Sequence, residues 1–212
     1  MQKTKNRAIS PKKMNAKAVE IIPLAQNFKK LIGSPECRGS WLVWGDSGNG
    51  KSTFLMQTAK ELAKYLKVDY NSLEEQDRGS MQALMAENRM EDCKKSHFML
   101  LNGWQLPELR ARLDKPRSAK VIIIDSVQYF TITITQYKQL LADYPTKLFI
   151  FNSHADGKYP KGALADKIRY DSDVKIRVQG FKAMSGSRMS RGKVTDDYII
   201  WDEGANNYWK NI

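Results

Sequence analysis

The chain has few of the features that are typical of secreted proteins, of proteins stabilised by a bound metal, or of membrane-spanning proteins. Only two of its 212 residues are cysteines, Cys37 and Cys93, and no spacing typical of a metal site is present. Reduced thiols are therefore expected. No apolar run approaches the roughly 20 residues that a membrane-spanning helix needs. The basic N-terminus also lacks the apolar segment of a secretion signal. We therefore expect a cytoplasmic protein without a membrane partner.

Acidic side chains are also scarce, and they are unevenly distributed. The formal net charge is +12. Residues 1–60 hold 11 basic and 3 acidic side chains, residues 147–193 hold 11 and 4, and residues 61–146 balance at 12 and 12. Two basic regions flanking a neutral middle favour a surface that binds a polyanion, with nucleic acid the leading candidate. A basic protein that is merely soluble is the alternative.

The length suits one α/β domain with additional segments at its N-terminus. Residues 1–17 are basic and poor in apolar side chains, so we expect a flexible arm. Residues 18–38 are more apolar and are expected to pack on the core or on a neighbouring subunit. Residues 39–212 form the expected main domain.

Within residues 39–212, apolar runs alternate with amphipathic stretches. This alternation favours a mostly parallel sheet covered by helices, that is, a three-layer α/β fold. Strands are expected at residues 41–44, 68–73, 98–102, 120–125 and 147–152, and helices at 52–67, 80–92, near 107 and at 136–143. Later strands are expected at residues 173–179, 198–201 and 207–209, with a turn at 203–206 that predicts a terminal antiparallel hairpin.

One motif lies between the first strand and the first long helix. Residues Gly45 to Ser52 read Gly-Asp-Ser-Gly-Asn-Gly-Lys-Ser, which matches the phosphate-binding loop G-x-x-x-x-G-K-[ST] at every position. The glycines let successive backbone N–H groups face a phosphate, and the helix N-terminus adds partial positive charge. Lys51 is expected to reach the β- and γ-phosphates, and the Ser52 hydroxyl to hold Mg²⁺. The expected ATP-binding residues are Gly45, Asp46, Ser47, Gly48, Asn49, Gly50, Lys51, Ser52 and Thr53.

Two further strands end in carboxylates that suit the same chemistry. Asp125 ends an apolar strand and is expected to order the Mg²⁺ shell, usually through water. The alternative is that Asp125 only caps the next turn. Glu74 and Glu75 follow the strand expected beside the phosphate loop, where a carboxylate can polarise a water. We expect Glu74 to be the general base, with Glu75 as the alternative.

These motifs, in this order, resemble the ATPase core of the RecA superfamily, which includes the RecA, RadA and DnaB-type motors. Besides the loop, the matching segments are Ser72-Leu73-Glu74, Ile123 to Gln128 and Leu148 to His154, within about Gly39 to Arg191. The resemblance implies a RecA-like P-loop fold and ATP hydrolysis. The resemblance further implies a chain close to a bare motor, similar to the compact stand-alone RecA-like proteins of bacteriophage recombination and replication modules.

The resemblance also implies roles for residues after the fifth strand. His154 stands where the family carries a residue that senses the γ-phosphate, although a surface histidine is the alternative. Residues 155–162 lie where RecA-like proteins carry a DNA-binding loop. Lys158 and Lys161 would pair with phosphates there, and Tyr159 would stack on an unpaired base.

A later basic stretch resembles the one that reaches a neighbouring subunit's nucleotide in RadA and DnaB-type proteins. Lys182 and Arg188 are therefore candidate catalytic cations delivered from a second copy of the chain, with Arg191 a weaker third. The family's tighter Lys-Asn-Arg spacing is not reproduced, and an ordinary basic loop explains the charges equally well.

Together these features predict a DNA-stimulated ATPase that forms a homo-oligomer on single-stranded DNA. Its role would be in recombination, annealing or replication. Two alternatives use the same loop. One is a small-molecule kinase, with Arg110, Arg112 and Arg117 as part of a lid. The other is a nucleotide-switched adaptor or loader that scarcely hydrolyses ATP.

Overall fold

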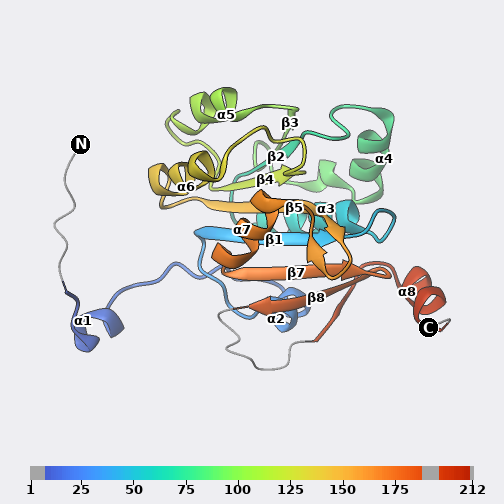
Figure 1. Cartoon of the computed structure of the whole chain (residues 1–212), viewed down its shortest axis with the longest axis horizontal. Coiled ribbons are helices and arrows are strands. Elements are labelled where there is room, and N and C mark those ends of the chain that lie inside the picture. The colour runs from blue at the N-terminus through green and yellow to red at the C-terminus, as the bar shows by residue number, and fades with distance from the viewer. Residues whose placement is uncertain (1–7, 188–195, 211–212) are drawn as a thin grey trace.

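The computed structural model describes residues 8–187 and 196–210 of the chain. In these residues a nine-stranded sheet is covered by helices (Figure 1). The strand order is β3-β2-β4-β5-β1-β7-β8-β9, and the short β6 pairs with β5. The strands are β1 (Gly39–Gly45), β2 (Val68–Ser72), β3 (Phe98–Asn102), β4 (Val121–Asp125), β5 (Leu148–Asp156), β6 (Tyr159–Pro160), β7 (Val174–Gln179), β8 (Lys182–Ser187) and β9 (Tyr198–Ile199). The helices are α1 (Pro11–Asn15), α2 (Gln26–Ile32), α3 (Lys51–Ala63), α4 (Gly79–Glu87), η1 (Met90–Asp92, a 3₁₀ turn), α5 (Leu106–Leu113), α6 (Ile134–Asp143), α7 (Ala163–Asp171) and α8 (Asp202–Trp209).

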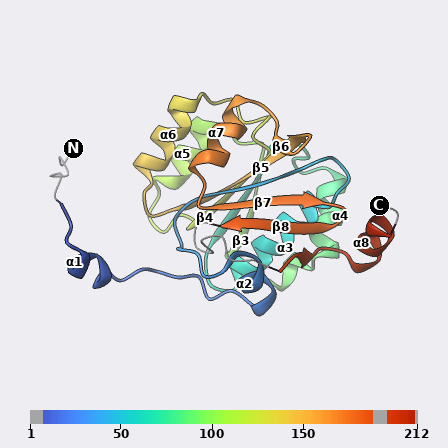
Figure 2. The same cartoon turned by 60° about the horizontal axis from the view of Figure 1, so that its bottom comes forward.

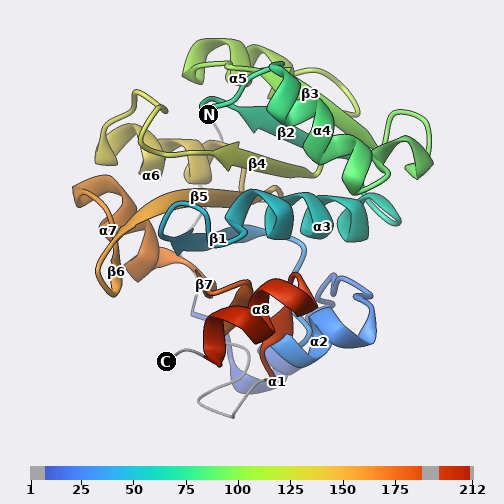
Figure 3. The ribbon, with the colours of Figure 1, turned by 90° about the vertical axis from the view of Figure 1, so that its right-hand side faces the viewer.

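Both faces of the central parallel strands are buried, which accounts for their apolar runs. One face packs against α2, α3 and α4, and the other against α5, α6 and α7 (Figure 3). The side chains of successive β1 residues pack on opposite faces of the sheet. Trp41 and Val43 belong to the first cluster, whereas Leu42 and Trp44 belong to the second. The predicted three-layer α/β fold with a mostly parallel sheet is confirmed.

Beyond β1 the sheet becomes antiparallel. β7 is parallel to β1, and β8 returns antiparallel to β7 after a turn at Gly180 and Phe181. β8 covers residues that the sequence analysis treats as a basic stretch. It was missed as a strand because its small and polar residues, Lys-Ala-Met-Ser-Gly-Ser, carry little β-propensity and depend on pairing with β7.

The predicted terminal hairpin is wrong, because residues 202–209 form the helix α8. Asp202 and Glu203 lie in its first turn, where negative charge favours a helix N-terminus. Gly204 is buried, and a Cβ there would overlap the ring of Trp201. Gly204 therefore allows α8 to pack closely on the Trp201 ring, and it does not form a turn.

The N-terminal residues divide into an exposed part and a packed part. Residues 8–20 are exposed, and α1 lies apart from the rest of the chain (Figures 1 and 2). Ser10 caps α1 by accepting a hydrogen bond from the Lys13 N–H, so a short helix stands where a flexible arm is expected. Residues 22–37 contribute buried side chains to the core, and the Phe28 ring lies 4.7 Å from that of Tyr198. Among the described residues, no helix has the length and apolar character needed to cross a membrane.

Candidate functional site

The phosphate-binding loop lies between the buried strand β1 and the 13-residue helix α3. Gly48 and Gly50 have φ angles of +74° and +90°, a region that favours glycine. A Cβ at Gly45 would overlap the backbone carbonyl of Val178 on β7. The loop conformation therefore needs its glycines, and it leaves the N-terminus of α3 directed to the carboxyl edge of the sheet.

A cleft of about 410 Å³ lies against this loop. Its lining residues come from the loop, from the ends of β2 and β5 and from the β7–β8 turn; they are Ser47, Gly48, Gly50, Lys51, Ser52, Thr53, Glu74, Glu75, Asn152, His154 and Phe181. The loop, the amine of Lys51 and a helix N-terminus form a donor set that fits a triphosphate. The loop between β1 and α3 and the fold around it are therefore those of a P-loop protein.

Lys51 is largely buried within the loop. Its Nζ donates a hydrogen bond to the carbonyl of Asp46 at 2.8 Å. Burial lowers the pKa of Lys51, and the nearby carboxylates of Asp125, Glu74 and Asp46 oppose that shift. The hydrogen bond to the Asp46 carbonyl and the negative charge of these carboxylates therefore hold the Lys51 ammonium group in the loop.

Asp125 ends β4 behind the wall of the cleft and is only 4% exposed. Asn152 Nδ2 donates to one of its carboxylate oxygens at 2.5 Å, and the hydroxyl of Tyr70 donates to the other. Burial raises the pKa of Asp125, whereas these two hydrogen bonds oppose the shift. The Ser52 hydroxyl and the Asp125 carboxylate carry oxygen atoms of the kind that Mg²⁺ prefers, so they are the residues that would hold the ion.

Glu74 is bonded to the ends of two other strands. Its Oε2 atom lies 3.0 Å from His154 Nε2, and Ser126 Oγ donates to the same oxygen at 3.4 Å. Its backbone N–H donates to the carbonyl of Asp125 at 3.3 Å. The Glu74 side chain is 40% exposed, and it lines the cleft. Glu75 lines the cleft as well, so both carboxylates are in reach of a substrate.

The strand that carries Glu74 is not next to the phosphate loop, as the sequence analysis assumed. β4 and β5 lie between β2 and β1. The residues still meet because all four strands are parallel and end at one edge of the sheet. In the register, Gly45 lies beside His154, and Ser72 lies beside Asp125.

Gln128 connects the site to the segment expected to bind nucleic acid. Its Oε1 accepts from the backbone N–H of His154 at 3.1 Å, and its Nε2 donates to the carbonyl of Lys161 at 2.9 Å. The N–H of Lys161 in turn donates to the carbonyl of His154 at 2.8 Å. These bonds make the end of β5 and the β6 hairpin one hydrogen-bonded unit.

The expected nucleic-acid-binding segment is a short hairpin rather than an open loop. β5 extends to Asp156 and pairs antiparallel with β6. Lys158, Tyr159 and Lys161 are exposed on this hairpin. The indole N–H of Trp44 donates to the carbonyl of Lys158 at 3.2 Å, which fixes the hairpin to β1.

Lys182, one of the expected trans-acting cations, is not among the residues that line the cleft of its own chain. Lys182 lies in β8, with its Nζ 5.2 Å from the ring centroid of Trp209. Arg188 and Arg191 lie outside the described residues. Among the described residues that line the cleft, Lys51 is the only cation.

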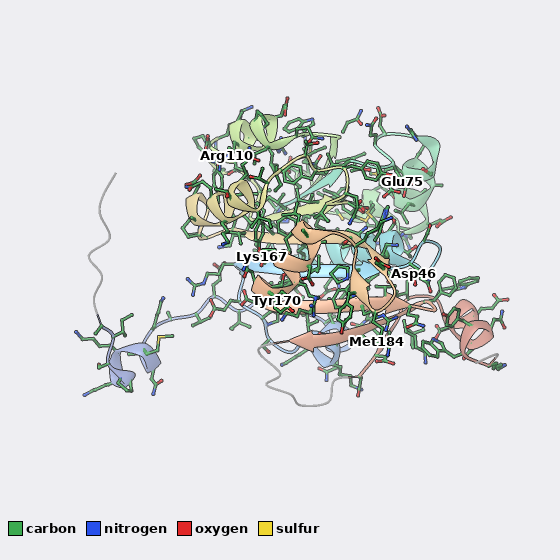
Figure 4. The ribbon with its side chains drawn as sticks, viewed as in Figure 1. Asp46, Glu75, Arg110, Lys167, Tyr170 and Met184 are labelled. Carbon is green, nitrogen blue, oxygen red and sulfur yellow. The ribbon has the colours of Figure 1, made fainter. Side chains whose placement is uncertain are left out.

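The arginines considered for a kinase lid lie elsewhere. Arg110 pairs with Asp143 at 2.6 Å, and Arg112 donates to both carboxylate oxygens of Asp69 at 2.5 and 2.7 Å. Figure 4 shows Arg110 at the opposite end of the sheet from Asp46 and Glu75. These two arginines therefore hold α5 to α6 and to β2, away from the cleft.

Several site residues escaped the sequence analysis. Asn152 and Tyr70 could have been predicted as site residues, because each places a polar group in a strand that is otherwise apolar and buried. Phe181 carried none, since its place depends on tertiary contacts. Its N–H donates to the Asn49 carbonyl at 3.3 Å, and the Gly180 N–H donates to Asn49 Oδ1 at 2.6 Å. The β7–β8 turn thus holds the phosphate loop from one side.

Comparisons with solved structures agree on the fold. The chain resembles the flagellar accessory protein FlaH from Methanocaldococcus jannaschii, with a TM-score of 0.58 and 14% identity over 85% of this chain and 93% of that one. It also resembles a KaiC-like protein from Pyrococcus horikoshii, with a TM-score of 0.59 and 18% identity over 81% and 88%. A comparison with protein-family models gives no match, and neither does one with curated proteins. The chain therefore shares its fold with these two proteins.

Proposed function

We propose that this chain is an ATP hydrolase whose rate is raised by single-stranded DNA. The observation that carries the proposal is the pairing of Glu74 with His154 at the cleft that also holds Lys51. A carboxylate, a hydrogen-bonding imidazole and a loop lysine at one cleft provide a base, a sensor and a phosphate ligand.

The residues divide the work of hydrolysis among them. Glu74, oriented by Ser126 and His154, accepts a proton from the attacking water. As the water oxygen bonds to the γ-phosphorus and the bond to the β,γ-bridging oxygen breaks, Lys51 places positive charge where the leaving ADP gains negative charge. When bound, Mg²⁺ neutralises phosphate charge, and Ser52 and Asp125 are the residues that would hold it. His154 links this chemistry to the hairpin through Gln128.

A second copy of the chain fits this proposal. The cleft is open, and phosphoryl transfer is strongly accelerated by a further cation. Because Lys51 is the only cation among the described lining residues, we infer that a neighbouring copy supplies another, with Lys182 and Arg188 as candidates. The active form would then be a homo-oligomer on single-stranded DNA, acting in recombination, annealing or replication in the cytoplasm.

Turnover of Mg-ATP with and without a single-stranded oligonucleotide tests the proposal. We expect phosphate release that rises several-fold when the oligonucleotide is added. Binding of ATP with negligible release in both conditions would contradict it and favour an adaptor. Release that requires a small phosphoryl acceptor would contradict it and favour a kinase.

A further inference from the structure

Three side chains stack on one another at the surface beside the β5–β6 hairpin. The guanidinium carbon of Arg169 lies 4.9 Å from the ring centroid of Tyr159 and 4.6 Å from that of Tyr170. Tyr159 comes from β6, whereas Arg169 and Tyr170 come from the end of α7. We call these three residues the stacking platform.

The platform is exposed although it is well ordered by its contacts. Tyr159 and Tyr170 are 59% and 60% exposed, so packing into the core does not account for two large rings there. Asp166, one turn earlier on α7, accepts from Arg169 Nε at 3.1 Å and from Nη2 at 2.9 Å. Because the guanidinium is already fixed, a flat ligand that stacks here loses little affinity to ordering the site.

A shallow, largely open pocket lies against the platform, and its openness suits one face of a flat ligand rather than an enclosed molecule. Its lining residues come from the hairpin and α7; they are Asp156, Tyr159, Pro160, Gly162, Ala163, Asp166, Arg169 and Tyr170. Two carboxylates in the wall disfavour a phosphate or an acidic peptide, whereas they can accept hydrogen bonds from amino groups. Lys158 and Lys161, which suit phosphates, lie on the same hairpin but are absent from the lining.

We propose that this pocket binds an unpaired nucleobase of single-stranded nucleic acid. The base stacks on the exposed ring of Tyr170, which Arg169 supports, and the flanking phosphates pair with Lys158 and Lys161. This inference rests on the proposed function and adds two residues of α7 to the expected hairpin contacts. Duplex bases are stacked within the helix, so the site selects single strands.

The pocket also adjoins the catalytic strand. Asp156 in its wall lies two residues after His154 on β5, and Lys161 and Gln128 bind the backbone of His154. A base that fixes the hairpin therefore fixes the end of β5, where the imidazole meets Glu74. Binding in this pocket is how nucleic acid would change the hydrolysis rate.

The test compares two oligonucleotides of equal length by fluorescence anisotropy, one with all its bases and one abasic. The full-length chain is measured as wild type, Tyr170→Ala, Tyr170→Phe and Tyr65→Ala. Tyr65 is a matched control, since it is an exposed tyrosine after α3 and outside the pocket. Each variant is checked for an unchanged unfolding temperature and unchanged basal ATP turnover.

The wild type should prefer the oligonucleotide with bases, and Tyr170→Ala should lose about 5- to 100-fold in affinity for it, the range of one stacking contact. Its binding of the abasic strand and its salt dependence should stay unchanged, because no phosphate contact is removed. Tyr170→Phe and Tyr65→Ala should bind like the wild type.

Two results would overturn the inference in different ways. If Tyr170→Ala keeps the full preference for bases, the pocket is not a base site, although the proposed function stands. If the wild type binds neither oligonucleotide, the nucleic-acid part of the proposed function fails as well.

Discussion

At the scale of single residues, the two glutamates after β2 differ in their partners. Glu74 bonds with His154 and Ser126, whereas Glu75 has neither contact and is the less exposed of the two. A general base needs an orientation fixed before the reaction, since a small misplacement costs much of the rate. The hydrogen bonds therefore favour Glu74 over Glu75 as the base.

Glu74→Gln should bind ATP normally and slow its hydrolysis by roughly 10²- to 10⁴-fold, because the amide keeps the shape of the carboxylate but cannot accept the proton. Single-turnover hydrolysis measures this step directly. Glu75→Gln is the matched control and should stay within a few-fold of the wild type. The reverse pattern, with only Glu75→Gln inactive, would move the base by one residue.

At the scale of elements, α8 supports the wall of the nucleotide cleft. The indole N–H of Trp209 donates to the carbonyl of Gly180 at 3.0 Å, and Gln179 donates to the hydroxyl of Tyr208 at 3.3 Å. A Cβ at Gly180 would overlap the ring of Tyr208. The N–H of Gly180 also donates to Asn49 in the phosphate loop. The β7–β8 turn therefore connects α8 to that loop.

Trp209→Ala should lower the unfolding temperature by a few degrees, as expected for a loss of about 1–2 kcal/mol in a chain of this size. It should also weaken ATP binding several-fold, because the turn that holds Asn49 loses its support. Thermal unfolding with and without ATP measures both effects. The milder Trp209→Phe keeps an aromatic ring but loses the indole N–H that donates to Gly180. Its unfolding temperature and ATP affinity should lie between those of the wild type and Trp209→Ala. An unchanged affinity in Trp209→Ala would show that α8 does not support the loop.

The elements also show where prediction from sequence works. The strand at residues 120–125 and the loop after β1 were predictable, because a buried apolar run and a fixed motif are local signals. α8 and β8 were not, because Gly204 packs on Trp201 and β8 depends on β7. Glu74 and His154 were found by order along the chain, but their mutual contact needed the strand order.

At the scale of the whole molecule, the cleft beside the phosphate loop and the basic β5–β6 hairpin lie in neighbouring regions. The cleft lies at the carboxyl edge of the parallel strands, and the hairpin with Lys158 and Lys161 extends from β5 at that edge. The residues between 147 and 193, which hold 11 basic and 4 acidic side chains, form β5 to β8 and α7 in their described part. If a polyanion binds this basic region, as we propose, it would lie beside the site that it would regulate.

The central claim is that a triphosphate binds in the loop from Gly45 to Ser52, and equilibrium titration with a non-hydrolysable Mg-ATP analogue tests it most directly. We expect saturable binding by the wild type and an affinity at least about 10-fold weaker for Lys51→Ala, which loses the buried ammonium group. Lys60→Ala, a lysine on the same helix but away from the cleft, is the control and should bind like the wild type. Equal affinity of Lys51→Ala and the wild type would contradict the account.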